Sequence, residues 1–481
     1  MPRLVAPTFY RHSLPCKLPR YYSKSSTVLL PASSPALSPL KNMPSAFPVH
    51  NLRPQPAFPP PISMSGSSHI RSMSAATQIN NSPPRPASER VAALVVGAGP
   101  SGIAVVGNLL ELLPPDKVVL WVDPRFQGGR INAHYREVPS NTKVKLFLDY
   151  AQAVEPFREI VESTPKPNAI TALQDLNPSD TCPLGKAGDM LLTLTSGLSA
   201  NSRVKISHAT VGDAQWVSAN SSWNMRIDDE NLNTSTSVEA PIVVYCTGSS
   251  PTVLPLPVSI LRQPNILDLD IALKPSLLKE HIPRDRELCV GVIGASHSAI
   301  LVLMNLVKLH TDSHPLLKVR WFTRTKNLKY AEDMGDWILY DNTGLKGLAA
   351  DFAQKHLDGE SFSRSHVSGF ITRVDCSGGT NQELQAYIQE MPSCDYLVQA
   401  VGYTRHPLPR LHQNLRYNHE TGGFLEQSTD SPVPGLFGTG IAFPERVVDP
   451  HGNVEYSVGF IKFMRYLKKV MPKWVAGVNN S

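Results

Sequence analysis

The stretch that decides the fold is Leu94-Val-Val-Gly-Ala-Gly-Pro-Ser-Gly-Ile-Ala104. An apolar run enters it, three glycines turn it, and an apolar helical pattern leaves it, which is the order of a strand, a tight turn and a helix. The first glycine permits the turn, the second lets a phosphate approach the backbone, and the third lets the helix pack closely on the strand. The helix N-terminus adds unpaired N–H groups that face the phosphates. The stretch therefore predicts a dinucleotide site whose contacts come from Gly97, Gly99, Pro100, Ser101 and Gly102.

An acidic residue at the expected distance supports this interpretation. Residues 118–122 predict the next strand, which ends at Asp123, 21 residues beyond Gly102. A carboxylate at about that spacing binds the ribose hydroxyls of a dinucleotide. The alternative is an ordinary strand, turn and helix followed by a surface aspartate.

Composition narrows the classes of partner. The 481 residues carry a formal net charge of +6, but residues 1–90 hold ten Lys and Arg against the single acid Glu89. The remainder is therefore slightly acidic, at about −3, which argues against nucleic acid as a partner. The six cysteines contain no Cys-x-x-Cys motif, which favours reduced thiols and no metal site. No apolar run of the length that spans a membrane is present.

Residues 1–90 differ in composition from the rest of the chain. They hold 17 of the 43 prolines and many serines, so we expect a disordered segment that cannot bury enough apolar surface to fold. Arg and Ser without acids are typical of organellar transit peptides, and Arg20-Tyr-Tyr-Ser23 resembles a mitochondrial cleavage site. Early prolines oppose the amphipathic helix that import usually needs, which leaves the cytosol as the alternative. Because the composition and the resemblance to a cleavage site favour a transit peptide, we expect mitochondrial import.

Two segments after the acidic residue extend the first site. Gly128 and Gly129 permit a loop over the cofactor pyrophosphate, and Arg130 can balance its charge. Asn141, flanked by two hydroxyl residues, can donate hydrogen bonds to a bound ring system. A capping turn before a helix is the more ordinary interpretation of that asparagine.

Later strands predict how the first domain continues. We predict strands for the alternating, β-branched segments at residues 204–211, 222–227 and 237–246. The last of them runs into Thr247 and Gly248, a small-residue turn that we expect to contact the cofactor. Prolines between residues 251 and 264 then mark a crossover between domains.

A second strand, turn and helix predict a second dinucleotide site. The apolar strand from Leu288 ends in Gly294, and Ser296 stands where a second glycine is usual. Ser298 can point its hydroxyl at a phosphate. The next strand ends at Arg324, within a basic cluster, and arginine at this place favours the 2′-phosphate of NADPH over the ribose of NADH. The alternative is a structural turn with surface basic residues.

The last third of the chain adds two more strand ends. Residues 394–401 predict a strand like the one before Gly248, and residues 434–440 predict a short strand whose final glycine, Gly440, contacts the cofactor. A closing helix at residues 458–470 is predicted to expose its Lys and Arg side chains to solvent. Residues 327–365 are polar and aromatic, which fits either a substrate pocket or a plain loop.

The ordered set of motifs resembles the flavoproteins with two dinucleotide-binding domains, which include flavin-containing monooxygenases, N-hydroxylating monooxygenases and pyridine nucleotide–disulfide oxidoreductases. The resemblance spans about residues 91–470. It implies an α/β fold with two Rossmann-like domains, FAD in the first and NADPH in the second. The implied divisions are a disordered segment at 1–90, a discontinuous FAD domain at 91–255 and 396–481, and an inserted NADPH domain at 256–395.

The most specific match covers residues 128–150, which resemble the segment of flavin-containing monooxygenases whose asparagine lies against the flavin and NADP. The resemblance makes Asn141 the candidate catalytic residue. Two features depart from the family pattern. The fingerprint histidine between the nucleotide motifs is absent, and Ile441 stands where an aspartate normally follows the closing glycine. Asp449 or Asn453 could replace that aspartate.

Three functions fit these features. The leading hypothesis is an FAD- and NADPH-dependent monooxygenase that acts with O2 on a small nitrogen-, sulfur- or carbonyl-containing molecule. The second is an FAD-dependent reductase that passes electrons to a quinone or protein, with its disulfide-exchanging branch excluded because no cysteine pair is seen. In both, FAD carries the redox chemistry and the protein orients it and excludes water. The third is a non-catalytic nucleotide-binding module, motivated by Ser296 and Ile441.

Overall fold

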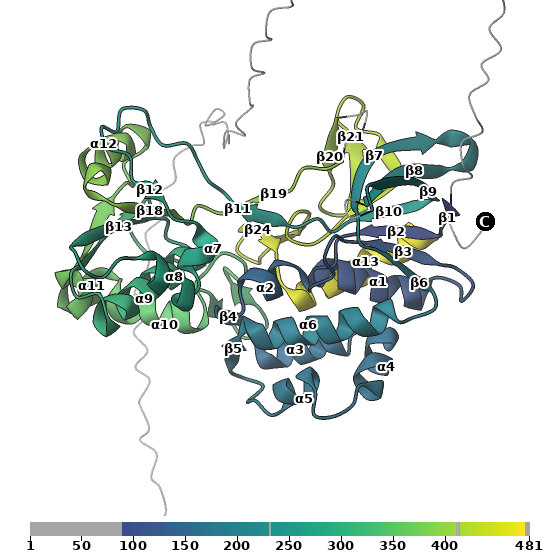
Figure 1. The fold of residues 1–481 in the computed structure, drawn as a ribbon, viewed down its shortest axis with the longest axis horizontal. Helices are drawn as coiled ribbons and strands as arrows, with labels where there is room; N and C mark the ends of the chain where they lie inside the picture. The colour runs from purple at the N-terminus through teal and green to yellow at the C-terminus, as the bar shows by residue number, and fades with distance from the viewer. Residues whose placement is uncertain (1–88, 230–231, 410, 412–413, 477–481) are drawn as a thin grey trace, which may run out of the picture. The chain divides into compact units, whose positions relative to one another are not determined.

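Two parallel sheets organise the chain in the computed structural model, which describes residues 89–229, 232–409, 411 and 414–476 (Figure 1). The second sheet is formed by a segment inserted into the first, so the predicted α/β class with two Rossmann-like domains is confirmed. The disorder and the transit signal predicted for residues 1–88 lie outside the described residues. Glu89 and Arg90 were also assigned to that segment, but they form strand β1.

The first sheet has seven strands, and its central strands are parallel. Its order is β20 (Leu415–Tyr417), β21 (Gly423–Glu426), β22 (Pro432–Gly438), β10 (Ile242–Tyr245), β2 (Ala93–Val96), β3 (Val119–Val122) and β6 (Val204–Ser207). All neighbours from β22 to β6 run parallel, whereas β20 and β21 are antiparallel. The strands next to β2 are apolar throughout because both faces of the sheet are covered.

Helices cover one face of this sheet, and a second sheet covers the other (Figure 1). The helices are α1 (Pro100–Leu112), α3 (Val144–Ala151), α4 (Glu155–Ser163), α5 (Ala169–Gln174), α6 (Leu184–Ser199) and α13 (Phe460–Val475). The covering sheet is β1 (Glu89–Arg90), β9 (Thr234–Ala240), β8 (Ser222–Asp229) and β7 (Thr210–Val217). Two separate hydrophobic cores result, one on each face.

The inserted segment builds a five-stranded parallel sheet. Its order is β12 (Asn265–Ile266), β18 (Tyr396–Gln399), β13 (Leu288–Ile293), β14 (Leu317–Thr323) and β17 (Ile371–Asp375). One face packs on α7 (Leu269–Ala272), α8 (Pro275–His281), α9 (His297–Asp312), α10 (Gly347–His356) and α11 (Gly359–Arg364), and the other on α12 (Thr380–Glu390). Because β18 belongs to this sheet, the chain returns to the first domain after Gln399, not at residue 396.

Short two-stranded ribbons and one short helix lie around the two sheets. The ribbons are β4 (Pro139–Lys143) with β5 (Thr181–Pro183), β11 (Ser249–Pro251) with β19 (Tyr403–Arg405), β15 (Glu332–Asp333) with β16 (Ile338–Leu339), and β23 (Glu445–Val448) with β24 (Val454–Ser457). The short helix α2 (Gly129–His134) follows the paired glycines. The β11–β19 ribbon pairs the two segments that connect the domains. Strand β11 lies where the chain leaves the first sheet, and β19 lies where it returns from the second.

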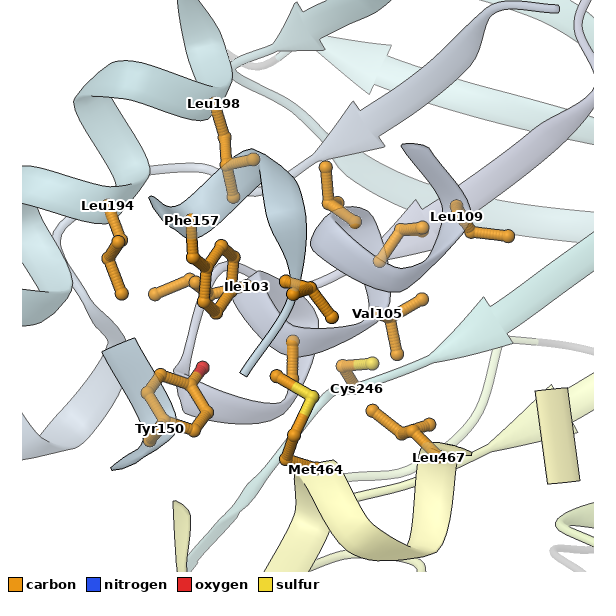
Figure 2. Packing of buried hydrophobic residues seen from close by; sticks show 14 of the residues in the cluster. Ile103, Val105, Leu109, Tyr150, Phe157, Leu194, Leu198, Cys246, Met464 and Leu467 are labelled. Atoms are coloured by element: carbon orange, nitrogen blue, oxygen red, sulfur yellow. The ribbon is translucent and has the colours of Figure 1, made fainter. Parts of the chain in front are cut away.

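Helix α1 is held from all sides, which fixes the turn at its start. Figure 2 shows its residues Ile103, Val105 and Leu109 together with Tyr150, Phe157, Leu194, Leu198, Cys246, Met464 and Leu467, contributed by the sheet and by neighbouring helices. Each fully buried aliphatic side chain contributes about 1.5–3 kcal/mol. The hydroxyl of Tyr150 also donates to the Pro100 carbonyl in the first helical turn.

Three predicted elements differ in the structure. The segment 204–211 divides into β6 and β7, and 237–246 divides at Pro241 into β9 and β10, so each crosses from one sheet to another. Proline lacks the N–H that a continuing ladder needs, which explains the second division. The closing helix begins at Phe460 and ends at Val475, beyond the predicted 470.

Candidate cofactor and active site

The first candidate site lies at a topological switch point of the first sheet. From β2 the chain adds β3 and β6 on one side, whereas β10 and β22 lie on the other side. In such sheets the crevice beyond the carboxyl ends of the two central strands binds the ligand. The Gly97 N–H donates to Val122 and the Cys246 N–H donates to Val96, each at 2.8 Å, which places the first glycine turn at this edge.

The glycines of the turn have separable roles. A Cβ atom at Gly97 would lie 2.4 Å from the Cys246 carbonyl oxygen, and one at Gly102 would lie 1.9 Å from the Gly97 oxygen. A Cβ at Gly129 would lie 2.8 Å from Gly99 Cα, so the paired-glycine loop packs on the turn. At Gly99 itself the nearest atom would be 3.8 Å away. The protein does not need a glycine there, and the open backbone fits the approach of a pyrophosphate.

Asp123 braces the glycine turn. One carboxylate oxygen accepts from the Ala98 N–H at 2.8 Å, and the other accepts from the N–H groups of Arg125 and Phe126, each at 2.8 Å. The predicted ribose contact stays a prediction. The structure adds that the same carboxylate holds the phosphate-facing loop in place.

Several residues at the same edge of the sheet have buried hydroxyls. Tyr245, Thr247, Ser249 and Thr439 each have a buried hydroxyl oxygen without a hydrogen-bond partner among the described residues. They stand at or just beyond the carboxyl ends of β10 and β22. An unsatisfied buried hydroxyl costs about 1–3 kcal/mol, so this edge fits a polar ligand that would complete their hydrogen bonds. Thr247 and its neighbour Gly248 were both predicted as cofactor contacts.

The closing turn packs directly on the start of α1. A Cβ at Gly440 would lie 2.7 Å from Ser101 Cβ, so only glycine fits this contact at its φ of +88°. Ile441 is half-exposed beside it. Asp449 accepts from the N–H and the side-chain amide of Asn453 within the β23–β24 hairpin turn. These two residues therefore bond to each other, and no contact from either to the closing glycine is seen in the described part of the chain.

Arg130 binds an acidic residue of the inserted domain. Its guanidinium forms an ion pair with Asp270 on α7, and its predicted contact with the pyrophosphate stays a prediction. The Tyr135 hydroxyl donates to the other oxygen of Asp270 at 2.9 Å. His134 Nδ1 lies 3.5 Å from the oxygen that Arg130 binds. Burial alone would lower the pKa of Arg130, but its bonds to Tyr135 and Asp270 raise it overall. Asp270 lies in the region where the family fingerprint is absent.

The second candidate site has the same construction in the inserted sheet. The switch point lies between β13 and β18, and a Cβ at Gly294 would lie 2.4 Å from the Ala400 oxygen. Ser296 is exposed at the N-cap of α9, and Ser298 is half-buried in the first helical turn. His297 between them has a buried Nδ1 without a partner among the described residues. Burial, together with the nearby Lys346 charge, lowers the pKa of His297 to about 4.

Arg324 stands where the sequence places it, directly after β14. Its Nε donates to Glu383 of α12 at 2.8 Å, while 71% of the side chain remains exposed. The hydrogen bond to Glu383 raises the pKa of Arg324. The carboxylate orients the guanidinium, and its exposed face suits an incoming phosphate.

Asn141 lies in strand β4, not in a capping turn. Its side chain is exposed, and its amide oxygen accepts from the Thr142 hydroxyl at 3.3 Å. Helix α3 starts at Val144 with Lys143 as its N-cap and without a side-chain cap, so the ordinary interpretation of Asn141 is wrong. Strand β4 pairs with β5 and lies against the start of α10, because a Cβ at Gly347 would be 3.7 Å from the Ser140 oxygen.

Residues that sequence reasoning missed lie at the contacts between the two domains. Asp270 is one, and Glu455 is another, since it binds the loop from Asp341 to Lys346. That loop lies within residues 327–365, for which a substrate pocket and a plain loop were both left open, and Lys462 also contacts it. Lys462 was expected to be solvated, but only 19% of its side chain is exposed. Its partners are more than 100 positions away, so no local pattern signals them. In the described residues, no helix is long and apolar enough to cross a membrane, and no cluster of metal ligands is present.

Comparisons with known proteins give relatives along most of the chain. Monooxygenase AgnR1 of Paecilomyces divaricatus is 49% identical over 395 residues, which are 81% of this chain and 99% of that protein. The ornithine hydroxylase PvdA from Pseudomonas aeruginosa matches in fold at 13% identity and a TM-score of 0.51, over 81% of this chain and 98% of its own. Ornithine N-hydroxylase KtzI of Kutzneria sp. 744 matches at 14% identity and a TM-score of 0.50, over 82% of this chain and 100% of its own. No protein-family model matches.

Proposed function

Since the chain belongs to the flavin-containing monooxygenase superfamily, an FAD- and NADPH-dependent class, we propose that it oxygenates a small organic molecule at nitrogen, sulfur or a carbonyl carbon. The observation that carries the proposal is the pair of glycine turns, each at the switch point of its own parallel sheet. FAD would lie on the turn at Gly97–Gly102 and NADPH on the turn at Gly294–Ser298. The relative named as a monooxygenase supports oxygen transfer over plain reduction.

The residues of this chain would bind the two cofactors and orient their rings. The open backbone at Gly99 and the N-terminus of α1 would hold the FAD pyrophosphate. Asp123 keeps the turn in shape and would bind the ribose. Arg324 would hold the 2′-phosphate of NADPH. Asn141 would orient the flavin or nicotinamide ring through its amide. Bound flavin supplies the redox chemistry, by which electrons from NADPH activate O2.

The fold neighbours do not select the substrate. Two of them are described as ornithine hydroxylases, but at 13–14% identity they share the fold alone. We therefore propose the substrate only by chemical class, as a small molecule with a nucleophilic nitrogen or sulfur, or a carbonyl group.

A direct test follows the electrons and the oxygen. The purified full chain is given anaerobic NADPH, then ¹⁸O₂ and a panel of amines, thioethers and ketones. We expect the yellow flavin band to bleach with NADPH much more than with NADH, and one ¹⁸O atom to enter the product. If a quinone is added as well, its reduction without labelled product would instead favour the reductase. A protein that refuses added FAD would favour the nucleotide-binding module and overturn the proposal.

We also propose that the chain is imported into mitochondria, on the acid-free, Arg- and Ser-containing composition of its first residues. A C-terminal fluorescent fusion should colocalise with a mitochondrial marker. Removal of residues 1–42 should return it to the cytosol. A fusion of the full chain that stays cytosolic would contradict the import.

A further inference from the structure

The loop from Tyr340 to Lys346 belongs to the inserted domain but is held by the first domain. It turns back on itself, with Tyr340 at a φ of +53° and the Gly344 N–H donating to the Tyr340 oxygen at 2.8 Å. Helix α10 follows it directly. Two elements of the C-terminal part of the first domain contact this loop, strand β24 and helix α13.

A half-buried cation, Lys462, holds one side of the loop. The Lys462 ammonium on α13 contacts the Asp341 carboxylate at 2.7 Å, the Asn342 side-chain oxygen at 2.7 Å and the Asp341 carbonyl at 3.2 Å. These three acceptors match the three N–H groups of the ammonium. Lys346 binds the other oxygen of Asp341 from within the loop. Burial lowers the pKa of Lys462, although Asp341 opposes that shift.

A buried anion holds the other side. Glu455 on β24 is only 4% exposed, and its carboxylate accepts from the Asn342 N–H at 2.9 Å and from the Asn342 amide at 3.2 Å. The Thr343 hydroxyl donates to its second oxygen. Lys462 therefore donates to the hydrogen-bond acceptors of the loop, and Glu455 accepts from its donors.

The charges of this cluster balance. Lys346 and Lys462 face Asp341 and Glu455, and each charged group has partners within the cluster. A balanced, satisfied set leaves little attraction for an additional ion, so the cluster is a structural contact and not a ligand site. Removal of one member would leave a buried charge without its partner, which is strongly destabilising.

The cluster is connected to both candidate sites. Helix α13 packs along α1, where the Asn108 amide lies 3.1 Å from Met464 Sδ, and α1 begins at the first glycine turn. On the other side, Lys346 precedes α10, which lies against the strand of Asn141, and its charge influences His297 in the second turn. A shift of the loop would therefore move the two nucleotide turns relative to each other.

We propose that Asp341, Asn342, Glu455 and Lys462 form an interdomain clamp that sets the separation and orientation of the two nucleotide sites. They are positioning residues, and this role rests on the proposed function. In a held geometry, the two electrons from NADPH reduce one oxygen atom to water while the other enters the substrate. In a loosened geometry, the same two electrons and two protons convert O2 to hydrogen peroxide.

The test compares Lys462→Met and Glu455→Gln with Lys469→Met. Lys469 lies on the same helix in an exposed ion pair, so it is the matched control. We expect both clamp variants to keep FAD, to exchange backbone hydrogens in residues 340–346 about tenfold faster, and to release more peroxide per NADPH than the control. The double variant Lys462→Met with Asp341→Asn removes one charge of each sign and keeps the cluster neutral, so it should recover folding if the single variant is unstable.

Two results would overturn the clamp: unchanged exchange in residues 340–346 in Glu455→Gln, or an equal change in Lys469→Met. If the wild-type chain fails to oxidise NADPH, the proposed function fails while hydrogen exchange still decides whether the contact holds the loop. Faster exchange with unchanged peroxide release would restrict the cluster to stability and would also reject the positioning role.

Discussion

The sulfur atoms of Cys289 and Cys394 lie 3.8 Å apart in the sheet of the inserted domain. Both thiols are buried, and the hydrogen bond between them lowers the pKa of Cys289. No local motif signals this pair, because the two cysteines are 105 positions apart. The pair lies on the face that packs against α12, remote from the nucleotide edge, so it gives no support to a disulfide-exchanging enzyme.

The proximity predicts a specific disulfide on oxidation. Treatment of the folded chain with diamide should join these two thiols with a loss of two hydrogens, because only a small approach brings the sulfurs to bonding distance. Peptide mapping by mass spectrometry checks the link, and Cys289→Ser should abolish it while Cys376→Ser leaves it. A linked peptide that contains another cysteine would contradict the prediction.

The glycines of the first turn should separate folding from cofactor binding. Gly99→Ala should leave the melting temperature within about 2 °C of the wild type, because the new methyl meets little protein. It should weaken FAD binding by about tenfold or more, because the methyl occupies the space through which the pyrophosphate approaches the backbone. Gly102→Ala should instead lower stability by several kcal/mol, since its Cβ overlaps the Gly97 oxygen. Thermal melts and FAD titration measure the two effects. FAD binding of wild-type affinity in Gly99→Ala would contradict the proposed FAD site at this turn.

Arg324 should decide nicotinamide preference. Arg324→Ala should raise the KM for NADPH by about 10- to 100-fold, the value of a charge-assisted hydrogen bond, and leave the KM for NADH nearly unchanged. Arg364→Ala is the matched control, since that arginine is exposed in the same domain within an i,i+4 pair. Steady-state kinetics with both coenzymes provide the measurement. Equal losses with NADH would show that Arg324 acts on the fold instead.

Asn141 should affect the reaction more than binding. Asn141→Ala removes a side chain that is exposed and makes one weak contact, so the melting temperature and the flavin spectrum should not change. The rate of product formation should fall by about 100-fold if the amide orients a ring during the reaction. Single-turnover measurements check this, and a wild-type rate would remove Asn141 from the site.

His297 should make the chain sensitive to acid. Its pKa is about 4 in the folded state against 6.5 in the unfolded chain, so the unfolded state binds the proton more tightly. Stability is therefore lost as the pH falls below 6.5 and continues to fall until about pH 4, by about 3 kcal/mol in total. His297→Gln should remove this part of the dependence and be the more stable protein at pH 5. Denaturant unfolding at pH 5 and pH 7.5 measures the free energy of unfolding of the wild type and of His297→Gln. The same loss of stability at pH 5 in both proteins would contradict the prediction.

Local patterns were enough to predict the two strand–turn–helix units, because strand, glycine turn and helix are adjacent in sequence at Gly97 and at Gly294. They were not enough to predict what lies across the domain contact. Arg130 and Asp270 are 140 positions apart, so no local pattern signals their ion pair. The division of 237–246 between two sheets was also missed, because alternation of side chains indicates a strand without indicating its neighbour.

The insertion of one sheet into the other has a consequence for synthesis. Strand β22 pairs with β10, so the first sheet cannot close until the ribosome has made both the inserted domain and the residues that follow it. The inserted sheet uses only residues 265–399 and can form as soon as they emerge. Meanwhile β10 presents an unpaired, wholly apolar edge. The domain that is begun first is therefore finished last, and during that interval the nascent chain depends most on chaperones.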